Sequence, residues 1–296
     1  MKNTIFTGAG VAIVTPMNAD GSVNYAALGE MIEMQIAGKT DAIIICGTTG
    51  ESSTLTDEEH KECIRYTVEK VAHRIPVIAG TGSNDTDYAI QLSKEAEEIG
   101  ADGLLLVTPY YNKTSQRGLI AHYTAIADAV NIPCILYNVP SRTGVNIAPE
   151  TLKTLSAHKN IVAVKEASGN ISQIAKVFAE CGDNLDVYSG NDDQIVPIMS
   201  LGGKGVISVL SNVAPELTHN ICELCLHNNF PEAAALANRS LKLANALFMD
   251  VNPIPVKEAL NMMGIAAGPC RLPLYEMEDE KKDKLRKVLT DLDMIK

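Results

Sequence analysis

The sequence of 296 residues contains no tryptophan, and aromatic residues make up only 4% of it. It also lacks any apolar run close to the ~20 residues that a membrane-spanning helix needs. At the amino terminus, residues 1–6 do not form the long apolar region of a signal peptide. We therefore expect a cytoplasmic protein that does not enter the membrane.

The sequence also lacks a basic character, because its 36 Asp and Glu residues outnumber its 25 Lys and Arg residues and the net charge is −11. Nucleic acids and anionic membranes bind basic surfaces, so neither is an expected partner. The seven cysteines are an odd number, and Cys46 and Cys134 lie inside apolar runs. This pattern is typical of reduced, buried thiols and argues against a disulfide framework.

Hydrophobic residues are abundant at 46%, enough for one large core. From Gly8 to about Leu210 the sequence repeats a short apolar strand, a turn and an amphipathic helix. Such alternation indicates parallel strands joined by right-handed crossovers, and eight units close a (β/α)8 TIM barrel. The predicted strands are Gly10–Thr15, Ala42–Cys46, Val77–Gly80, Gly103–Val107, Cys134–Asn138, Ile161–Glu166, Asp186–Ser189 and Gly205–Val209. An open doubly wound sheet is less favoured, because its glycine-rich fingerprint would follow the first strand, whereas Gly8-Ala9-Gly10 precedes it.

Helix signals fill the spaces between these strands and continue after the last one. A capping box from Thr56 to Glu59 opens one helix, and Asn84 or Asp85 opens the next. Further helices are predicted near Gln116–Val130, Pro149–Ser156, Ile171–Cys181, Pro215–Asn228, Pro231–Phe248, Pro255–Met263 and Asp279–Ile295. We expect a catalytic barrel domain over residues 1–229 and a C-terminal helical region over residues 230–296.

The sixth predicted strand ends in a lysine. Strand alternation places Ile161, Ala163 and Lys165 on one face. An ammonium group at the end of an apolar strand needs a partner or loses its proton, and a neutral lysine can form an imine with a carbonyl compound. The alternative is a lysine whose amino group simply reaches solvent.

Other polar groups follow neighbouring strands, and in a barrel these carboxyl ends share one rim. The turn over residues 47–50 offers backbone N–H groups and two hydroxyls to a carboxylate or phosphate. Tyr137 could pass protons, and Arg142 could hold a second carboxylate with two hydrogen bonds. Taken singly, each has a simpler interpretation as a turn, a lining aromatic or a surface arginine. Their convergence with Lys165 favours an enzyme.

Three motifs resemble the signatures of the dihydrodipicolinate synthase (4-hydroxy-tetrahydrodipicolinate synthase) family, in register over nearly the whole chain. They are Gly47-Thr48-Thr49-Gly50-Glu51, Tyr137-Asn138-Val139-Pro140 with Arg142-Thr143-Gly144, and Val164-Lys165-Glu166-Ala167. The wider superfamily of pyruvate-dependent class I aldolases and lyases, including N-acetylneuraminate lyase, shares the lysine, the tyrosine and a similar turn. The double threonine and Arg142 favour the synthase.

The resemblance implies that Lys165 forms an imine with pyruvate and then an enamine. The enamine would condense with L-aspartate-4-semialdehyde to 4-hydroxy-tetrahydrodipicolinate, in lysine and diaminopimelate biosynthesis. It further implies that Tyr137 relays protons with Thr48 and with Tyr111, which reaches across a dimer interface. Substrate binding would involve Thr49, Arg142, Gly190 and Ile207. A homotetramer of two tight dimers is implied, and no metal or organic cofactor.

The sequence departs from lysine-inhibited family members at the site where they bind L-lysine. Ser52, His60, Asn84 and Tyr110 match that set of residues, whereas Asp57 replaces a histidine and Tyr88 replaces an acidic residue. Without that carboxylate the ammonium group of lysine loses a charge partner. We therefore expect a degenerate allosteric site and weak or absent inhibition by L-lysine.

Two other functions remain open at this point. One is a related aldolase or lyase that uses the same enamine on a sugar acid, and the other is a catalytically silent barrel that only binds. The set of Lys165, Tyr137 and Arg142 argues against the silent barrel. A metal site on the segment from His219 to His227 is disfavoured, because its two histidines cannot converge with Cys222 and Cys225 on one helix.

Overall fold

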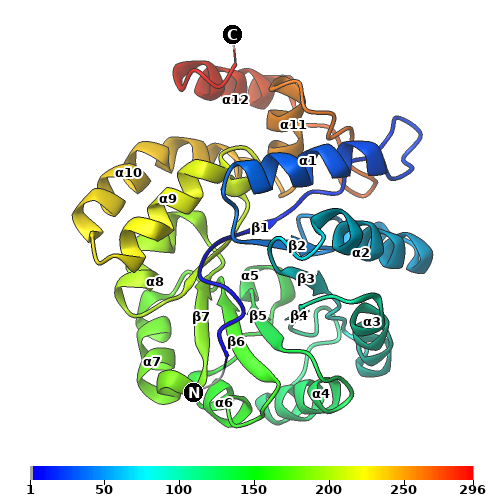
Figure 1. Cartoon of the computed structure of the whole chain (residues 1–296), viewed down its shortest axis with the longest axis vertical. Helices are drawn as coiled ribbons and strands as arrows, with labels where there is room; N and C mark the ends of the chain where they lie inside the picture. Colours follow the sequence, from blue (N-terminus) through cyan, green and yellow to red (C-terminus); the bar gives the residue numbers. More distant parts are fainter. Residues whose placement is uncertain (1–2, 296) are drawn as a thin grey trace.

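Residues 3–295, which the computed structural model describes, form a closed barrel of eight parallel strands surrounded by helices (Figure 1). Each strand pairs with its neighbour in sequence, and the last strand pairs with the first, at Gly8 with Gly205. The strands are β1 (Gly8–Ala12), β2 (Ala42–Ile45), β3 (Val77–Gly80), β4 (Gly103–Val107), β5 (Cys134–Asn138), β6 (Ile161–Glu166), β7 (Asp186–Ser189) and β8 (Gly205–Ser208). The predicted (β/α)8 barrel is confirmed.

Helices connect consecutive strands on the outside of the barrel. The predicted capping box is present, since Thr56 accepts from the Glu59 N–H and the Glu59 carboxylate accepts from the Thr56 N–H. The helices that connect consecutive strands are α1 (Tyr25–Ala37), α2 (Asp57–Val71), α3 (Thr86–Ile99), α4 (Gln116–Asp128), α6 (Pro149–Leu155), α7 (Ile171–Cys181) and α8 (Ile195–Ser200). The short α5 (Pro140–Thr143) lies at the rim directly after β5, and α9 (Pro215–Leu226) follows β8. Short 3-10 turns are η1 (Ser52–Thr54), η2 (Gly182–Asn184), η3 (Asp192–Gln194) and η4 (Leu210–Asn212).

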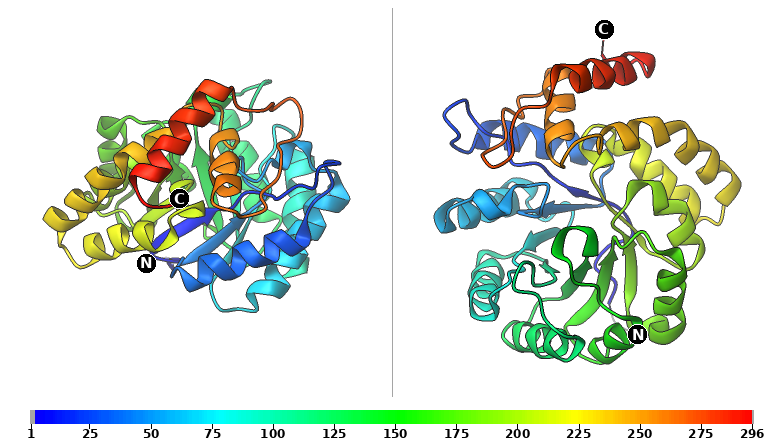
Figure 2. Two further views of the ribbon diagram at one scale, coloured as in Figure 1. Left: turned by 90° about the horizontal axis from the view of Figure 1, so that it is seen from above. Right: turned by 180° about the vertical axis from the view of Figure 1, so that it is seen from behind.

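The C-terminal region consists of α10 (Phe230–Ala246), α11 (Ile254–Met262) and α12 (Asp279–Asp291). Figures 1 and 2 show α11 and α12 on the side of the barrel where α1 lies. Helix α10 packs against both α9 and α12, so it joins the ring of barrel helices to the last helix. The predicted domain boundary after residue 229 falls between α9 and α10 and stays a prediction.

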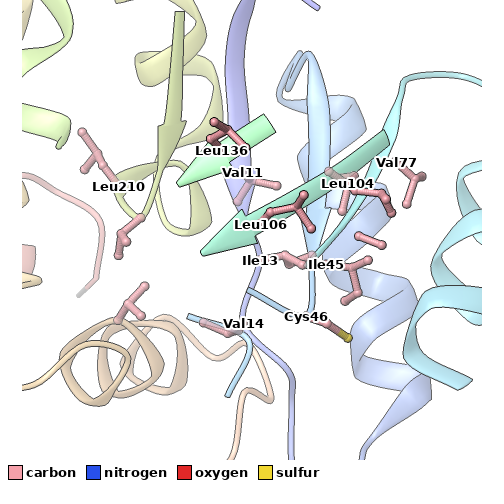
Figure 3. Close-up of a cluster of buried hydrophobic side chains, with 14 of the residues drawn as sticks. Val11, Ile13, Val14, Ile45, Cys46, Val77, Leu104, Leu106, Leu136 and Leu210 are labelled. Atoms are coloured by element: carbon pink, nitrogen blue, oxygen red, sulfur yellow. The ribbon is translucent and has the colours of Figure 1, made fainter. Parts of the chain in front are cut away.

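Two apolar layers fill the molecule, one inside the barrel and one between the strands and the helices. Strand alternation assigns the residues, so Leu105 of β4 lies in the interior cluster while Leu104 and Leu106 lie in the outer one. Figure 3 shows part of the outer layer, with Val11 and Ile45 among its residues besides these two leucines. The polar groups of the rim lie next to this interior layer, at the carboxyl ends of the strands.

Several details of the sequence prediction are wrong. Gly8-Ala9-Gly10 does not precede the first strand but lies inside β1, where it pairs with β8. In β6 a register shift follows Ile161, because Cys134 pairs with Ile161 and the next residue of β5 pairs with Ala163. As a result Ile161 faces the outer cluster and Val162 joins the interior one, opposite to simple alternation.

The sequence patterns also failed to predict α1, α5 and α8. Helices α5 and α8 are too short to show a helical period.

Within residues 3–295, no helix has both the length and the apolar character that are needed to cross a bilayer.

A buried ion pair ties the C-terminal region to the barrel rim. The Nζ of Lys257 in α11 lies 2.8 Å from Oε1 of Glu51, and both side chains are at most 2% exposed. Lys257 also donates to the carbonyl oxygens of Thr15 at 3.0 Å and Pro269 at 2.6 Å. The other Glu51 oxygen accepts from the backbone N–H of Arg271 at 2.8 Å. The turn after β2 is therefore held by chain that lies more than 200 residues later.

We expect Lys257→Met to lower the free energy of unfolding by about 3–5 kcal/mol, because it leaves the Glu51 carboxylate buried without its charge partner. Denaturant unfolding measures this change. Lys39→Met is the control: its pair with Glu216 is 59% and 62% exposed, and its loss should cost less than about 1 kcal/mol. Equal effects of the two substitutions would contradict this account.

Candidate active site

The barrel interior places the predicted reactive lysine against a tyrosine. Tyr137 of β5 and Lys165 of β6 are paired in register, and Lys165 Nζ lies 4.2 Å from the centroid of the Tyr137 ring. Lys165 is 5% exposed and Tyr137 7% exposed. A neutral amine in this position can attack a carbonyl carbon, and the phenol beside it can take up or return a proton.

Gly190, which follows β7, gives the lysine its space. A Cβ atom at this position would lie 3.2 Å from Cε of Lys165 and 2.6 Å from Cβ of Ala167. Ile207 of β8 is fully buried in the interior cluster with Ala163. The structure thus brings these two predicted binding residues into the layer that surrounds the lysine.

A buried carboxylate near Lys165 escaped the sequence analysis. Asp192 in η3 accepts from Ser208 Oγ at 2.5 Å and from the backbone N–H groups of Val209 and Leu210 at 3.1 Å and 2.9 Å. Burial raises the pKa of Asp192, and these hydrogen bonds and the charge of Lys165 oppose that rise. In the sequence, the signal that could have pointed to Asp192 was its position in the run Gly190-Asn191-Asp192-Asp193 after β7.

The two threonines after β2 occupy a tight turn. The Gly50 N–H donates to the Gly47 carbonyl, and the Glu51 N–H donates to the Thr48 carbonyl. Thr49 is 3% exposed, and its Oγ1 accepts from Nδ2 of Asn252 at 2.9 Å. The turn can present its hydroxyl groups to a carboxylate.

Arg142 lies on the same rim, in a segment for which the sequence patterns predicted no helix. The segment forms α5, a single helical turn with Pro140 at its start and Gly144 at φ 67° at its end. Nη2 of Arg142 donates to the Asn252 carbonyl at 3.3 Å. The Arg142 side chain is otherwise exposed and can bind a carboxylate.

The end of β5 is fixed by a buried hydrogen-bond network. Asn138 Nδ2 donates to both oxygens of Glu166, at 3.2 Å and 3.0 Å, and to Asn146 at 2.9 Å. Its Oδ1 accepts from the Ile147 N–H at 3.0 Å. Burial raises the pKa of Glu166. This network sets the position of Tyr137 and of the segment that carries Arg142.

A cavity of about 600 Å³ opens at this rim. Among the residues that line it are Thr48, Tyr137 and Arg142 from the predicted active site. Thr49, Lys165, Gly190 and Ile207 do not line it. Lys165 nevertheless contacts Tyr137, which lines the cavity.

Tyr111 stands apart from these groups. It is 91% exposed and has a left-handed backbone at φ 67°. It does not line the cavity. Within one chain the structure does not bring Tyr111 to Tyr137, and its predicted role in proton relay depends on a second copy.

The predicted lysine-binding residues are only partly brought together. Four of them line the same 600 Å³ cavity: Ser52, His60, Tyr88 and Tyr110. Asn84 lines a separate cavity of about 320 Å³, and Asp57 lines neither. The Tyr88 hydroxyl donates to Oδ1 of Asp57 at 2.6 Å, and burial together with this bond raises the pKa of Tyr88 to about 12. Burial lowers the pKa of His60, whose Nε2 lies 2.9 Å from the Gly80 carbonyl.

A metal centre is not formed within residues 3–295, where no group of three or more His, Cys, Asp and Glu side chains could hold an ion. In the segment singled out above, His219 instead bonds to Asp41 at 2.9 Å. Cys222 is buried, and burial raises the pKa of its thiol.

The comparisons with known proteins agree with one another. Residues 5–292 match the model of the Dihydrodipicolinate synthetase family. The chain is 59% identical to the 4-hydroxy-tetrahydrodipicolinate synthase of Lachnoclostridium phytofermentans, over 96% of this chain and 98% of the relative.

Solved structures give the same result. The chloride-inhibited dihydrodipicolinate synthase of Acinetobacter baumannii, complexed with pyruvate, aligns with a TM-score of 0.97 at 44% identity, covering 99% and 100% of the two chains. The enzyme of Cyanidioschyzon merolae with lysine bound aligns with a TM-score of 0.96 at 40% identity, covering 99% and 100%. The chain therefore belongs to the dihydrodipicolinate synthetase family of enzymes.

Proposed function

We propose that this enzyme condenses pyruvate with L-aspartate-4-semialdehyde to 4-hydroxy-tetrahydrodipicolinate through an imine on Lys165. The observation that carries the proposal is the contact of Lys165 Nζ with the Tyr137 ring, in a family in which a relative binds pyruvate. The Lys165 amine adds to the ketone carbon of pyruvate, and water leaves to form the imine. Loss of a methyl proton gives an enamine, whose carbon attacks the aldehyde, and the aldehyde oxygen takes up a proton to become the hydroxyl group. The amino group of the second substrate then adds to the imine carbon, which closes the ring and releases the Lys165 amine.

The remaining residues bind the substrates and move protons. Tyr137 exchanges protons with the reacting oxygen, joined to solvent through Thr48 and Tyr111. Thr48 and Thr49 bind the pyruvate carboxylate, and Arg142 binds the carboxylate of the second substrate. Gly190 and Ile207 line the pyruvate pocket. The imine draws electrons from the methyl carbon, so the reaction needs no metal or organic cofactor.

We further propose a homotetramer of two tight dimers, in which Tyr111 completes the proton relay of a second copy. Its 91% exposure supports this proposal, because a large aromatic side chain gains free energy when a partner covers it. The barrel of residues 1–229 then carries the chemistry.

Formation of the imine can be tested by chemical trapping. Borohydride reduction in the presence of pyruvate should attach a covalent adduct to the peptide that carries Lys165, as measured by mass spectrometry. Lys165→Arg should abolish both the adduct and the activity, because guanidinium does not form this imine. The Lys257 peptide is the internal control, since that buried amine is held by Glu51 and two carbonyl oxygens. An adduct elsewhere, or none, would overturn the proposal.

The binding of the second substrate can be tested at Arg142. Arg142→Gln should raise the KM for aspartate semialdehyde roughly 10- to 100-fold, the loss expected for hydrogen bonds to a charged group. The KM for pyruvate should stay nearly constant. Arg142→Lys keeps the charge but loses the paired hydrogen bonds, so its effect should be intermediate. Steady-state kinetics with each substrate varied in turn measure this. A product formed from N-acetylmannosamine or glyceraldehyde alone would favour the sugar-acid aldolase instead.

We also propose that L-lysine inhibits this enzyme weakly or not at all. Position 88 supplies a phenol in place of a carboxylate, and Tyr88 already hydrogen-bonds the carboxylate of Asp57. In addition, Asn84 faces a different cavity from Ser52 and His60.

This arrangement predicts that lysine sensitivity can be increased by substitution. The double variant Asp57→His/Tyr88→Glu should become at least roughly tenfold more sensitive to L-lysine, because it regains a charged partner for the lysine ammonium. The single variant Asp57→His, without that new carboxylate, is the control. Inhibition curves measure both. Half-inhibition of the unmodified enzyme at submillimolar L-lysine would contradict the proposal.

A further inference from the structure

Asn252 reaches the candidate active site from outside the barrel. It lies in the segment between α10 and α11 and is only 6% exposed. Its Nδ2 donates to Thr49 Oγ1 at 2.9 Å, although the two residues are 203 positions apart. Its backbone carbonyl accepts from Arg142 Nη2 at 3.3 Å. One residue of the C-terminal region therefore touches both groups assigned to substrate carboxylates.

We propose that Asn252 is a positioning residue that orients the Thr49 hydroxyl toward the pyruvate carboxylate. The inference rests on the proposed function, because it concerns the pyruvate site described there. A threonine hydroxyl has one hydrogen to donate and two lone pairs that accept. In this structure the Asn252 amide occupies a lone pair of Thr49, which leaves the hydroxyl hydrogen to donate to an incoming anion.

Preorganisation explains why such a contact matters. A free hydroxyl rotates among several orientations, and the enzyme has to order it when the substrate binds. A donor that is already aimed at the charge avoids this reorganisation. Thr49 is 3% exposed and lies at the base of the turn, so its orientation depends on buried neighbours. Asn252 is the residue that supplies the amide donor.

The Asn252 backbone is held independently of its own side chain. Five residues further on, Lys257 donates to Glu51 at 2.8 Å, and Glu51 belongs to the same turn as Thr49. The Arg271 guanidinium donates to Glu59 at 2.5 Å and 2.7 Å, and to the Thr54 carbonyl at 2.6 Å. These bonds lock α11 and the following segment onto residues 51–59. A substitution of the Asn252 side chain therefore leaves the backbone in place.

The two contacts of Asn252 predict different kinetic effects. The contact with Thr49 uses the side chain, whereas the contact with Arg142 uses the backbone carbonyl. Replacing the side chain removes the first and keeps the second. The effect should therefore fall on pyruvate and spare aspartate semialdehyde. A residue that only stabilised the fold would not separate the two substrates.

The test measures how much pyruvate half-saturates borohydride trapping at Lys165, without the second substrate. Asn252→Ala should raise this concentration about tenfold, within the range for a lost hydrogen bond to a charged group. Asn252→Asp should raise it further, because the new carboxylate accepts the Thr49 hydrogen and repels the substrate anion. Steady-state kinetics should show an unchanged KM for aspartate semialdehyde.

A double-mutant cycle separates a direct from an indirect role. If Asn252 acts through Thr49, the variant Thr49→Val/Asn252→Ala should match Thr49→Val alone. Asn261→Ala is the matched control, because Asn261 lies in α11 and its side chain bonds the backbone of Gly268, not the threonines or Arg142. It should leave pyruvate binding unchanged.

Each outcome decides something. Trapping in the unmodified enzyme with an unchanged half-saturating concentration in Asn252→Ala would overturn the role of Asn252 and leave the proposed function intact. Additive effects of the two substitutions would do the same. A failure to trap pyruvate on Lys165 in the unmodified enzyme would overturn both.

Discussion

The closure of β8 on β1 is the constraint on which the site depends. Once the parallel strands form a ring, all their carboxyl ends meet at one rim, and side chains distant in sequence become neighbours. The pairing of β5 with β6 then sets Tyr137 beside Lys165. Gly190 after β7 leaves room for the lysine. The reactive geometry thus follows from strand register and from one missing side chain.

Buried charged groups also hold this rim in place. Asp192 and Glu166 are both buried carboxylates satisfied by several donors. Glu166 holds Asn138 and through it the strand of Tyr137, whereas Asp192 holds the start of η4 near Lys165. The ion pair of Glu51 and Lys257 ties the turn that carries Thr48 and Thr49 to α11. The C-terminal region is accordingly part of the construction of the site.

Much of this could be predicted from the sequence. Five of the strands, among them β5 and β6, have the bounds that the apolar runs predicted, because a buried parallel strand leaves a clear pattern. The reversal of Ile161 and Val162 could not be predicted, since a bulge depends on the neighbouring strand. Asn252 escaped detection for a similar reason. A single asparagine before a proline has no periodic pattern, and its contacts lie 110 and 203 residues away.

The sequence by itself determined the order of the eight strands, the lysine at the end of the sixth strand and the motifs that point to the family. These are local properties, written in neighbouring residues. The tertiary structure decided which side chains meet: that Lys165 lies on the ring of Tyr137, that Asn84 lines a different cavity from His60, and that Asn252 of the C-terminal region hydrogen-bonds Thr49. Hydrogen bonds and ion pairs between distant residues exist only once the barrel is closed, so only the fold could reveal them.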